Sequence, residues 1–194
     1  AVPNIGQVVM ASAADEEAET PAALATALYL GGSTGRGFLG LPLEKHLPSG
    51  WLPGVKLLLR GPLGQGFRLP TNIRRLGLAA LGETAARLLP LANRGLTQGA
   101  DVVLFADQIP TILPASVEFQ PLSALPDTLA WMDFLALDLP REALPGLRQM
   151  LHLEPEQPLS CPAQALVTSA LPCAGLAGCG ACALPARRGW KLIC

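Results

Sequence analysis

The C-terminal segment 173–194 contains four of the five cysteines in the chain, with the spacing C-x5-C-x2-C-x11-C: Cys173, Cys179, Cys182 and Cys194. Thiolates repel one another at close range, so such a group requires disulfide bonds or a metal centre that holds the negative charge. The glycines and alanines between the first three cysteines allow the backbone to wrap tightly and to direct N–H groups at sulfur. This composition favours an iron–sulfur loop.

Three interpretations of these cysteines remain open at this point. Plant-type [2Fe-2S] ferredoxins have C-x4-C-x2-C and a distant fourth cysteine, so this chain differs by one residue in the first gap. Structural zinc sites usually have two C-x2-C pairs, and only Cys179 and Cys182 have that spacing. We favour a [2Fe-2S] cluster, and zinc on the one hand and disulfides or free thiols on the other are two alternatives of equal weight. Cys161 stands apart in an apolar stretch and is expected to be a small buried hydrophobic residue.

The composition of the chain argues against some functions. A net charge of −1 without a run of lysine or arginine argues against nucleic acid as the main partner. Only 15% of the residues are charged, against roughly 25% in an average soluble domain, so we expect part of the surface to be covered by a partner protein. The stretch from Gln157 to Ala186 has no charged residue, but four prolines interrupt it, so we expect no membrane span.

The first residues, Ala1 to Ile5, lack the basic and apolar regions of a signal peptide. Clustered cysteines without an export signal indicate a metal centre in a reducing compartment. We therefore expect a cytoplasmic protein, associated with a larger complex.

The middle of the chain predicts a small parallel sheet with helices on its faces. Apolar runs predict strands over 76–81, 101–106, 117–122 and 133–139, and helical periodicity predicts helices over 83–94 and 141–151. Earlier strands are expected over 6–12, 24–30 and 55–59, with a flexible glycine-rich loop at 31–37. A last short element is expected at 163–167, before the cysteines.

The strand at 55–59 runs directly into G-P-L-G-Q-G-F at 61–67, and G-R-G precedes it at 35–37. With the cysteine-rich end, these motifs resemble the ferredoxin-reductase superfamily, most closely the electron-transfer subunit of dihydroorotate dehydrogenase. The resemblance implies an α/β protein with a truncated flavin-barrel-like domain at 1–70 and a nucleotide-binding-like domain at 71–155. It implies a [2Fe-2S] loop at 156–194, with Cys173, Cys179, Cys182 and Cys194 as ligands.

The chain departs from this family at both organic cofactor sites. The R-P-x-S segment that binds flavin in the family is missing, and residues 6–12 occupy its place. A dinucleotide site needs several glycines between its first strand and helix, but residues 78–84 contain only Gly82. Glu83, expected at the helix N-terminus, would repel a phosphate. We therefore expect neither FAD nor NAD(P)H to bind, and the glycines of 61–67 to serve turn geometry.

The leading hypothesis is an accessory electron-transfer subunit that carries one [2Fe-2S] cluster and works with larger redox subunits. The alternative is a structural or assembly subunit whose cysteine loop holds zinc or no metal. A complete flavin reductase is disfavoured by the missing R-P-x-S segment. His46 and His152 lie in no hydrolase pattern, so no catalytic residue is predicted. Trp190, close to Cys194, is placed to shield a cluster from water.

Overall fold

The computed structural model describes residues 2–14, 25–34, 36–43, 47–154, 157–186 and 189–194. His46 and Gly35 lie outside these ranges. The chain forms two compact units, the first made of residues 1–66 together with 169–194 and the second of 67–168. The region predicted for 156–194 is therefore divided: residues 169–194, with the four clustered cysteines, belong to the first unit, and residues 157–168 belong to the second.

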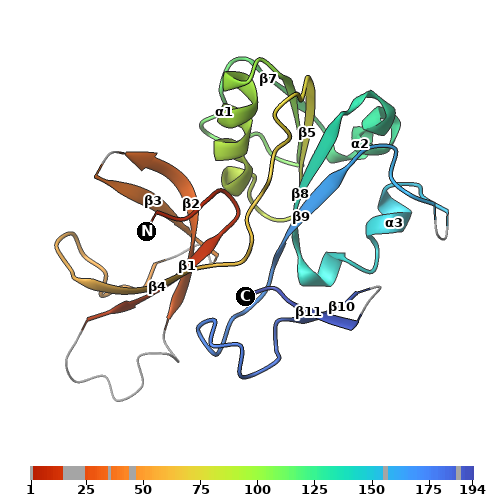
Figure 1. Ribbon diagram of the computed structural model, residues 1–194. Helices are drawn as coiled ribbons and strands as arrows, with labels where there is room; N and C mark the ends of the chain where they lie inside the picture. Colours follow the sequence, from red (N-terminus) through yellow and green to blue (C-terminus); the bar gives the residue numbers. More distant parts are fainter. Residues whose placement is uncertain (1, 15–24, 35, 44–46, 155–156, 187–188) are drawn as a thin grey trace. The chain divides into compact units, whose positions relative to one another are not determined.

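The first unit contains a four-stranded antiparallel sheet in the order β3-β2-β1-β4 (Figure 1). Its strands are β1 (Val8–Ala13), β2 (Thr26–Thr34), β3 (Gly37–Pro42) and β4 (Leu57–Leu63). The apolar run at the start of β1 is buried between its two neighbours. A separate hairpin joins β10 (Ala183–Ala186) to β11 (Gly189–Leu192) and follows the cysteine-rich turns.

The glycine-rich stretch 31–37 is not the flexible loop that its composition predicted. Gly31 and Gly32 extend β2, and Gly37 begins β3. A Cβ atom on Gly31 would lie 2.7 Å from Cγ of Leu41 on the paired strand. Glycine here permits close cross-strand packing, so the predicted loop is wrong over these residues.

The second unit is built on a five-stranded parallel sheet in the order β7-β6-β5-β8-β9. Its strands are β5 (Arg75–Ala80), β6 (Asp101–Phe105), β7 (Val117–Gln120), β8 (Phe134–Pro140) and β9 (Ala163–Thr168). Counted from β5, the spatial order is 3-2-1-4-5, the doubly wound arrangement in which the order reverses between the first and fourth strands. The predicted α/β class, with an antiparallel sheet before a parallel one, is confirmed.

The helices are shorter than the sequence predicted. They are α1 (Leu89–Thr97), α2 (Leu125–Thr128) and α3 (Leu147–Met150), with 3-10 turns η1 (Ala86–Leu88), η2 (Leu122–Ala124), η3 (Leu129–Trp131) and η4 (Arg141–Ala143). Pro90 lies in the first turn of α1, where a missing N–H is tolerated, so the helix begins later than Glu83. Pro145 and Gly146 interrupt the helix expected over 141–151. No helix in the described part of the chain is long and apolar enough to cross a lipid bilayer.

Helices cover both faces of the parallel sheet (Figure 1). On one face α1 packs so closely that a Cβ on Gly95 would lie 2.7 Å from Cδ2 of Leu76. On the other face Leu125 and Leu129 join the inward residues of β8 in a buried cluster. Because successive strand residues point to opposite faces, Asp138 of β8 faces the α1 side.

Candidate functional site

The four C-terminal cysteines lie in the first unit as two close pairs. The Sγ atoms of Cys182 and Cys194 are 3.2 Å apart, and the side chain of Cys179 lies near enough to Cys173 to lower the pKa of that thiol. A disulfide would require about 2.05 Å between the sulfurs, and all five cysteines are free thiols. The loop therefore pairs the first cysteine with the second and the third with the fourth.

Backbone contacts bring each pair together. The N–H of Ile193 donates to the carbonyl oxygen of Cys182 at 3.0 Å, next to the β10–β11 ladder, which places Cys194 beside Cys182. The N–H of Leu176 donates to the carbonyl oxygen of Cys173 at 3.0 Å and closes a tight turn. Ala174 lies in that turn with a φ of 48°, a value that non-glycine residues rarely adopt. Such outliers gather at functional sites.

The environment of Cys173 stabilises its thiolate. The hydrogen bond from the Cys179 side chain, followed by those from the backbone N–H groups of Cys179, Gly178 and Leu176, lowers the pKa of Cys173 to about 6. The thiolate is the form that binds metal ions. This half of the loop is therefore prepared to hold negative charge on sulfur.

The two thiols of the second pair, Cys182 and Cys194, differ in how easily they ionise. Burial opposes ionisation of Cys182, but hydrogen bonds from the backbone and side chain of Cys194 and from the backbone of Ile193 outweigh it and lower the pKa of Cys182. Burial, together with the hydrogen bond to Cys182 and the negative charges of Cys182 and Cys173, raises the pKa of Cys194 to about 11. Cys182 therefore ionises more readily than Cys194.

The loop is open on one side. Cys182 is only 1% exposed, whereas Cys179 is exposed and the other two are half-buried. Trp190 is 72% exposed, so its ring covers little of its surroundings and does not serve as the shield that the sequence suggested. Cys161 is buried in the core of the second unit, as expected for a small hydrophobic residue.

Within the described ranges, no three cysteine, histidine or carboxylate side chains are close enough together to hold one metal ion. A tetrahedral zinc site needs its four ligands around a single point. The two sulfur pairs do not provide that arrangement.

A second candidate site lies at the end of β5 and β8, where the strand order reverses. Open parallel sheets bind ligands in this crevice, beyond the carboxyl ends of the strands. Here Arg87 and Asp138 form a buried bidentate ion pair, with Nε to Oδ2 at 2.8 Å and Nη2 to Oδ1 at 3.1 Å. A Cβ on Gly82 would lie 3.8 Å from Nη2 of Arg87. The guanidinium thus lies beside the loop where a dinucleotide phosphate would need space.

The charges at this crevice differ from the sequence-based expectation. Burial raises the pKa of the Asp138 carboxyl against the opposing effect of Arg87. Neither η1 nor α1 has an acidic residue in its first turn, so Glu83 does not sit at a helix N-terminus as predicted. The ion pair could not be predicted from the sequence, because its partners are far apart in the chain and neither belongs to a motif.

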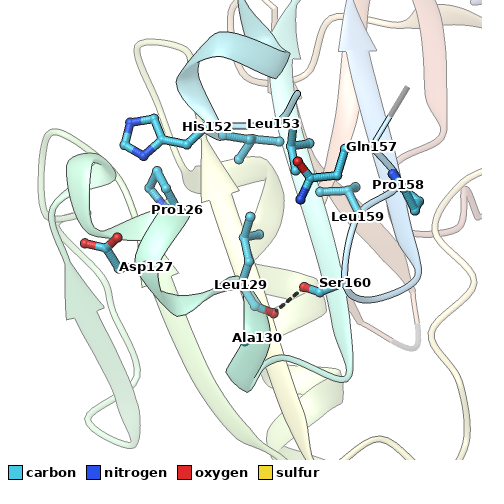
Figure 2. A pocket seen from close by; sticks show the side chains of 11 residues that line it. Pro126, Asp127, Leu129, Ala130, His152, Leu153, Gln157, Pro158, Leu159 and Ser160 are labelled. Carbon is cyan, nitrogen blue, oxygen red and sulfur yellow. Dashed lines mark hydrogen bonds between the residues drawn. The ribbon is translucent and has the colours of Figure 1, made fainter. Parts of the chain in front are cut away.

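A third feature is a pocket of about 480 Å³ in the second unit, between α2 and residues 151–153 and 157–160 (Figure 2). Its polar groups are largely used within the protein. Ser160 Oγ donates to the carbonyl oxygen of Leu129 at 3.0 Å, and Oε1 of Gln157 accepts the N–H of Glu154 at 3.0 Å. The exposed His152 also lines the pocket. We assign no ligand to this pocket.

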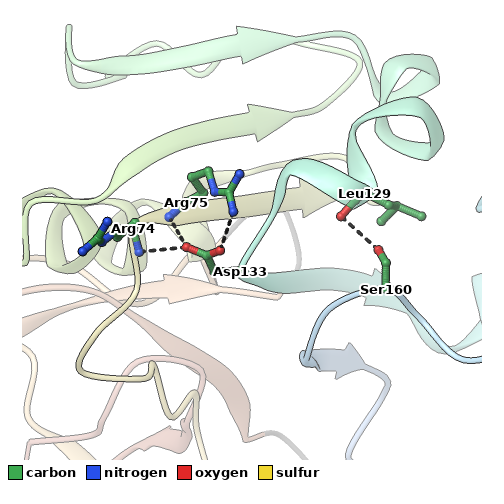
Figure 3. Close-up of polar contacts among 5 residues, drawn as sticks. All are labelled: Arg74, Arg75, Leu129, Asp133 and Ser160. Carbon is green, nitrogen blue, oxygen red and sulfur yellow. Dashed lines mark hydrogen bonds and ion pairs between the residues drawn. The ribbon is translucent and has the colours of Figure 1, made fainter.

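The carboxylate of Asp133, just before β8, stabilises the fold of the second unit. Asp133 accepts the backbone N–H groups of Arg74 and Arg75 on Oδ2, at 3.1 and 3.0 Å, and the guanidinium of Arg75 on Oδ1 at 2.9 Å (Figure 3). These bonds, the one from the Arg75 side chain first, lower the pKa of Asp133. They tie the start of β8 to the start of β5.

No protein-family model and no curated protein matches this sequence, but solved structures share its fold. The structure of the NADH-dependent reduced ferredoxin-NADP oxidoreductase, described in connection with flavin-based electron bifurcation, matches with a TM-score of 0.70 and 16% identity. The match covers 98% of this chain and 75% of that one. The fold is that of the ferredoxin reductases. The predicted resemblance is confirmed at this level, and the closer likeness to the dihydroorotate dehydrogenase subunit stays a prediction.

Two further structures agree on the fold. The FAD apo form of the ferredoxin reductase in carbazole 1,9a-dioxygenase has a TM-score of 0.52 and 20% identity over 84% of this chain. The Amycolatopsis cytochrome P450 reductase GcoB has a TM-score of 0.52 and 13% identity over 86%. This chain spans 58% and 62% of the two reductases.

Proposed function

We propose that the protein is an accessory electron-transfer subunit in which Cys173, Cys179, Cys182 and Cys194 bind one [2Fe-2S] cluster. The pairing of the sulfurs carries the proposal. Four thiolates hold the two irons of such a cluster, and because two sulfides bridge the irons, each iron takes two thiolates. A protein loop with two separate cysteine pairs suits this centre better than a single zinc ion, which needs all its ligands around one point.

The electrostatics of the loop support the same centre. Lowered pKa values of Cys173 and Cys182 favour the thiolate form that metals require. The raised pKa of Cys194 results partly from neighbouring negative charge, which two iron ions would neutralise. Backbone N–H groups directed at sulfur are also a means by which proteins adjust cluster potentials.

The exposure of the loop supports a role in a complex with larger redox subunits. When bound, a [2Fe-2S] cluster supplies one-electron chemistry, and the protein contributes ligation and orientation. Cys179 lies on the exposed side of the loop, the side from which an electron could be exchanged with a partner. The apolar side chains of Leu176, Trp190 and Leu192 are also exposed in this region, as is common on surfaces that contact other proteins.

We propose further that the chain binds neither NAD(P)H nor FAD. The Arg87–Asp138 ion pair at the strand reversal and the shortage of glycines in 78–84 support this for the nucleotide. For FAD the support is the missing R-P-x-S segment. Among the families that share the fold, we propose the electron-transfer subunit of dihydroorotate dehydrogenase as the nearest functional relative.

The alternative function is a structural or assembly subunit with a metal-free cysteine loop. One observation favours it: the described side chains form no group of three ligands around a single point. A zinc-bound version of the loop would require the two pairs to rearrange into one tetrahedron.

Anaerobic purification followed by analysis of iron, acid-labile sulfide and zinc tests the proposal. We expect iron and sulfide in equal amounts, absorption bands in the visible and an EPR signal after reduction. Cys179→Ser and Cys182→Ser should bleach the visible bands, whereas Cys161→Ser, at the buried core cysteine, should leave them unchanged. A colourless protein with all thiols titratable would support the structural alternative, and one zinc per chain would support its zinc-bound version.

A further inference from the structure

The corner at the end of β4 contacts both halves of the cysteine loop. The N–H of Gly64 donates to the carbonyl oxygen of Cys194 at 3.1 Å. A Cβ atom on Gly175, two residues after Cys173, would lie only 2.1 Å from Cδ1 of Leu63. Leu63 therefore lies against the segment of the first cysteine pair, and Gly64 holds the last cysteine of the second.

This corner is firmly anchored in the N-terminal sheet. Leu63 is paired with Val8 of β1, and Nε2 of Gln7 donates to the carbonyl oxygen of Gly64 at 2.8 Å. Gly64 has a φ of 77°, and a Cβ on Gly66 would lie 2.8 Å from the carbonyl oxygen of Ile5. Both glycines are required by the turn itself. The corner thus forms a rigid support for an otherwise irregular loop.

We propose that Leu63 and Gly64 are positioning residues that set the separation of the two cysteine pairs. The inference rests on the proposed [2Fe-2S] function, because the separation matters when two irons must be spanned. The G-P-L-G-Q-G-F segment, which has the composition of a phosphate-binding loop, then supports sulfur ligands through Leu63 and the N–H of Gly64. Supporting residues of this kind orient metal ligands and adjust the properties of the centre.

A steric test follows from the contact between Leu63 and Gly175. In Gly175→Ala the new methyl group collides with Leu63 and displaces the loop from the corner. Gly175 has a positive φ of 76°, so alanine adds backbone strain there besides the collision, and the control must share that strain. Shortening the partner in Leu63→Ala/Gly175→Ala removes the colliding atoms. Gly180→Ala is the matched control, because Gly180 also has a positive φ, of 66°, and nothing lies within 4 Å of a Cβ at that position.

Cluster content and the EPR spectrum are the first readouts, measured after reconstitution of each full-length variant with ferrous iron and sulfide. We expect Gly175→Ala to hold at least five-fold less iron and sulfide than the unaltered chain. The double variant should recover at least half of the content with an unaltered EPR spectrum, and Gly180→Ala should match the unaltered chain. If circular dichroism shows that a variant with Leu63→Ala does not fold, the smaller change Leu63→Val replaces it in the double variant. Full cluster content in Gly175→Ala, or no recovery in a folded double variant, would overturn the proposal.

Hydrogen exchange of the Gly64 amide in the metal-free chain separates this inference from the proposed function. We expect the exchange rate to rise at least ten-fold in Gly175→Ala, because the bond to Cys194 is lost, and to fall back in the double variant. An unaltered chain that takes up no iron would refute the cluster but not the positioning contact. Unchanged exchange in Gly175→Ala would refute the positioning contact itself.

Discussion

The ion pair between Arg87 and Asp138 places two charges in the interior of the second unit, where they are 5% and 0% exposed. Removal of one partner from a buried pair leaves an unpaired charge and typically costs about 3–5 kcal/mol of stability. We expect Arg87→Met to lower the free energy of unfolding by about that amount. Urea denaturation followed by circular dichroism measures the change.

A double-mutant cycle isolates the pair from other contacts of Arg87. Arg87→Met/Asp138→Leu replaces both charges by apolar groups, which is often neutral or even stabilising for a buried pair. The double variant should therefore be clearly more stable than the sum of the single losses implies. Strict additivity would show that the two side chains do not depend on each other.

Asp133 predicts a pH dependence of stability. Its folded-state pKa is lowered from 3.8 by Arg75 and by two backbone N–H groups, so its stabilising contribution is complete above the unfolded pKa. That contribution is lost as the pH falls through the lower folded-state pKa. In Asp133→Asn the urea midpoint should therefore fall less steeply below about pH 4 than in the unaltered chain. An equally steep fall in both proteins would contradict this origin.

At the scale of the elements, the contact between α1 and the sheet depends on the missing side chain of Gly95. Alanine normally stabilises a helix interior by about 1 kcal/mol relative to glycine. Here its Cβ would lie 2.7 Å from Leu76, which is fully buried, and overpacking of a core costs about 1–3 kcal/mol. We expect Gly95→Ala to lower the thermal midpoint and Gly95→Ala/Leu76→Val to recover part of the loss. A rise in the thermal midpoint of Gly95→Ala would show that Leu76 and the sheet shift to accommodate the new methyl group.

The sequence predicted the elements whose pattern is local. The apolar runs of β5, β6 and β8 identified buried parallel strands, and the composition of 173–194 identified the candidate ligands. Helix starts were less predictable, because Pro90 and Pro145 decide where the backbone can become helical. The glycines of 31–37 predicted a flexible loop, but in the structure the missing Cβ of Gly31 permits close packing against Leu41.

The arrangement of the candidate site could not be predicted from the sequence, for a physical reason. The bond from Gly64 to Cys194 and the pair of Arg87 with Asp138 join residues distant in the chain, and no periodicity reports such contacts. The division of four cysteines into two pairs depends on the turn at Ala174 and on the β10–β11 hairpin. Spacing alone left iron, zinc and disulfides open.

At the scale of the whole molecule, the second unit is continuous in sequence and has its own sheet, with a core on each face. Such a unit can fold independently. We expect the fragment 67–168 to unfold cooperatively on heating and to give a dispersed amide NMR spectrum. A fragment that stays unfolded would show that the second unit depends on the remainder of the chain.

The first unit is assembled from two segments that the whole of the second unit separates. During synthesis from the N-terminus, the strands β1 to β4 leave the ribosome long before the cysteines that complete their unit. Domains generally fold as units during synthesis. The second unit can therefore reach its native state before residues 169–194 of the first unit have been synthesised. Under the proposed function, iron delivery to the thiols would be a late event in the maturation of the polypeptide, after most of its chain is already folded.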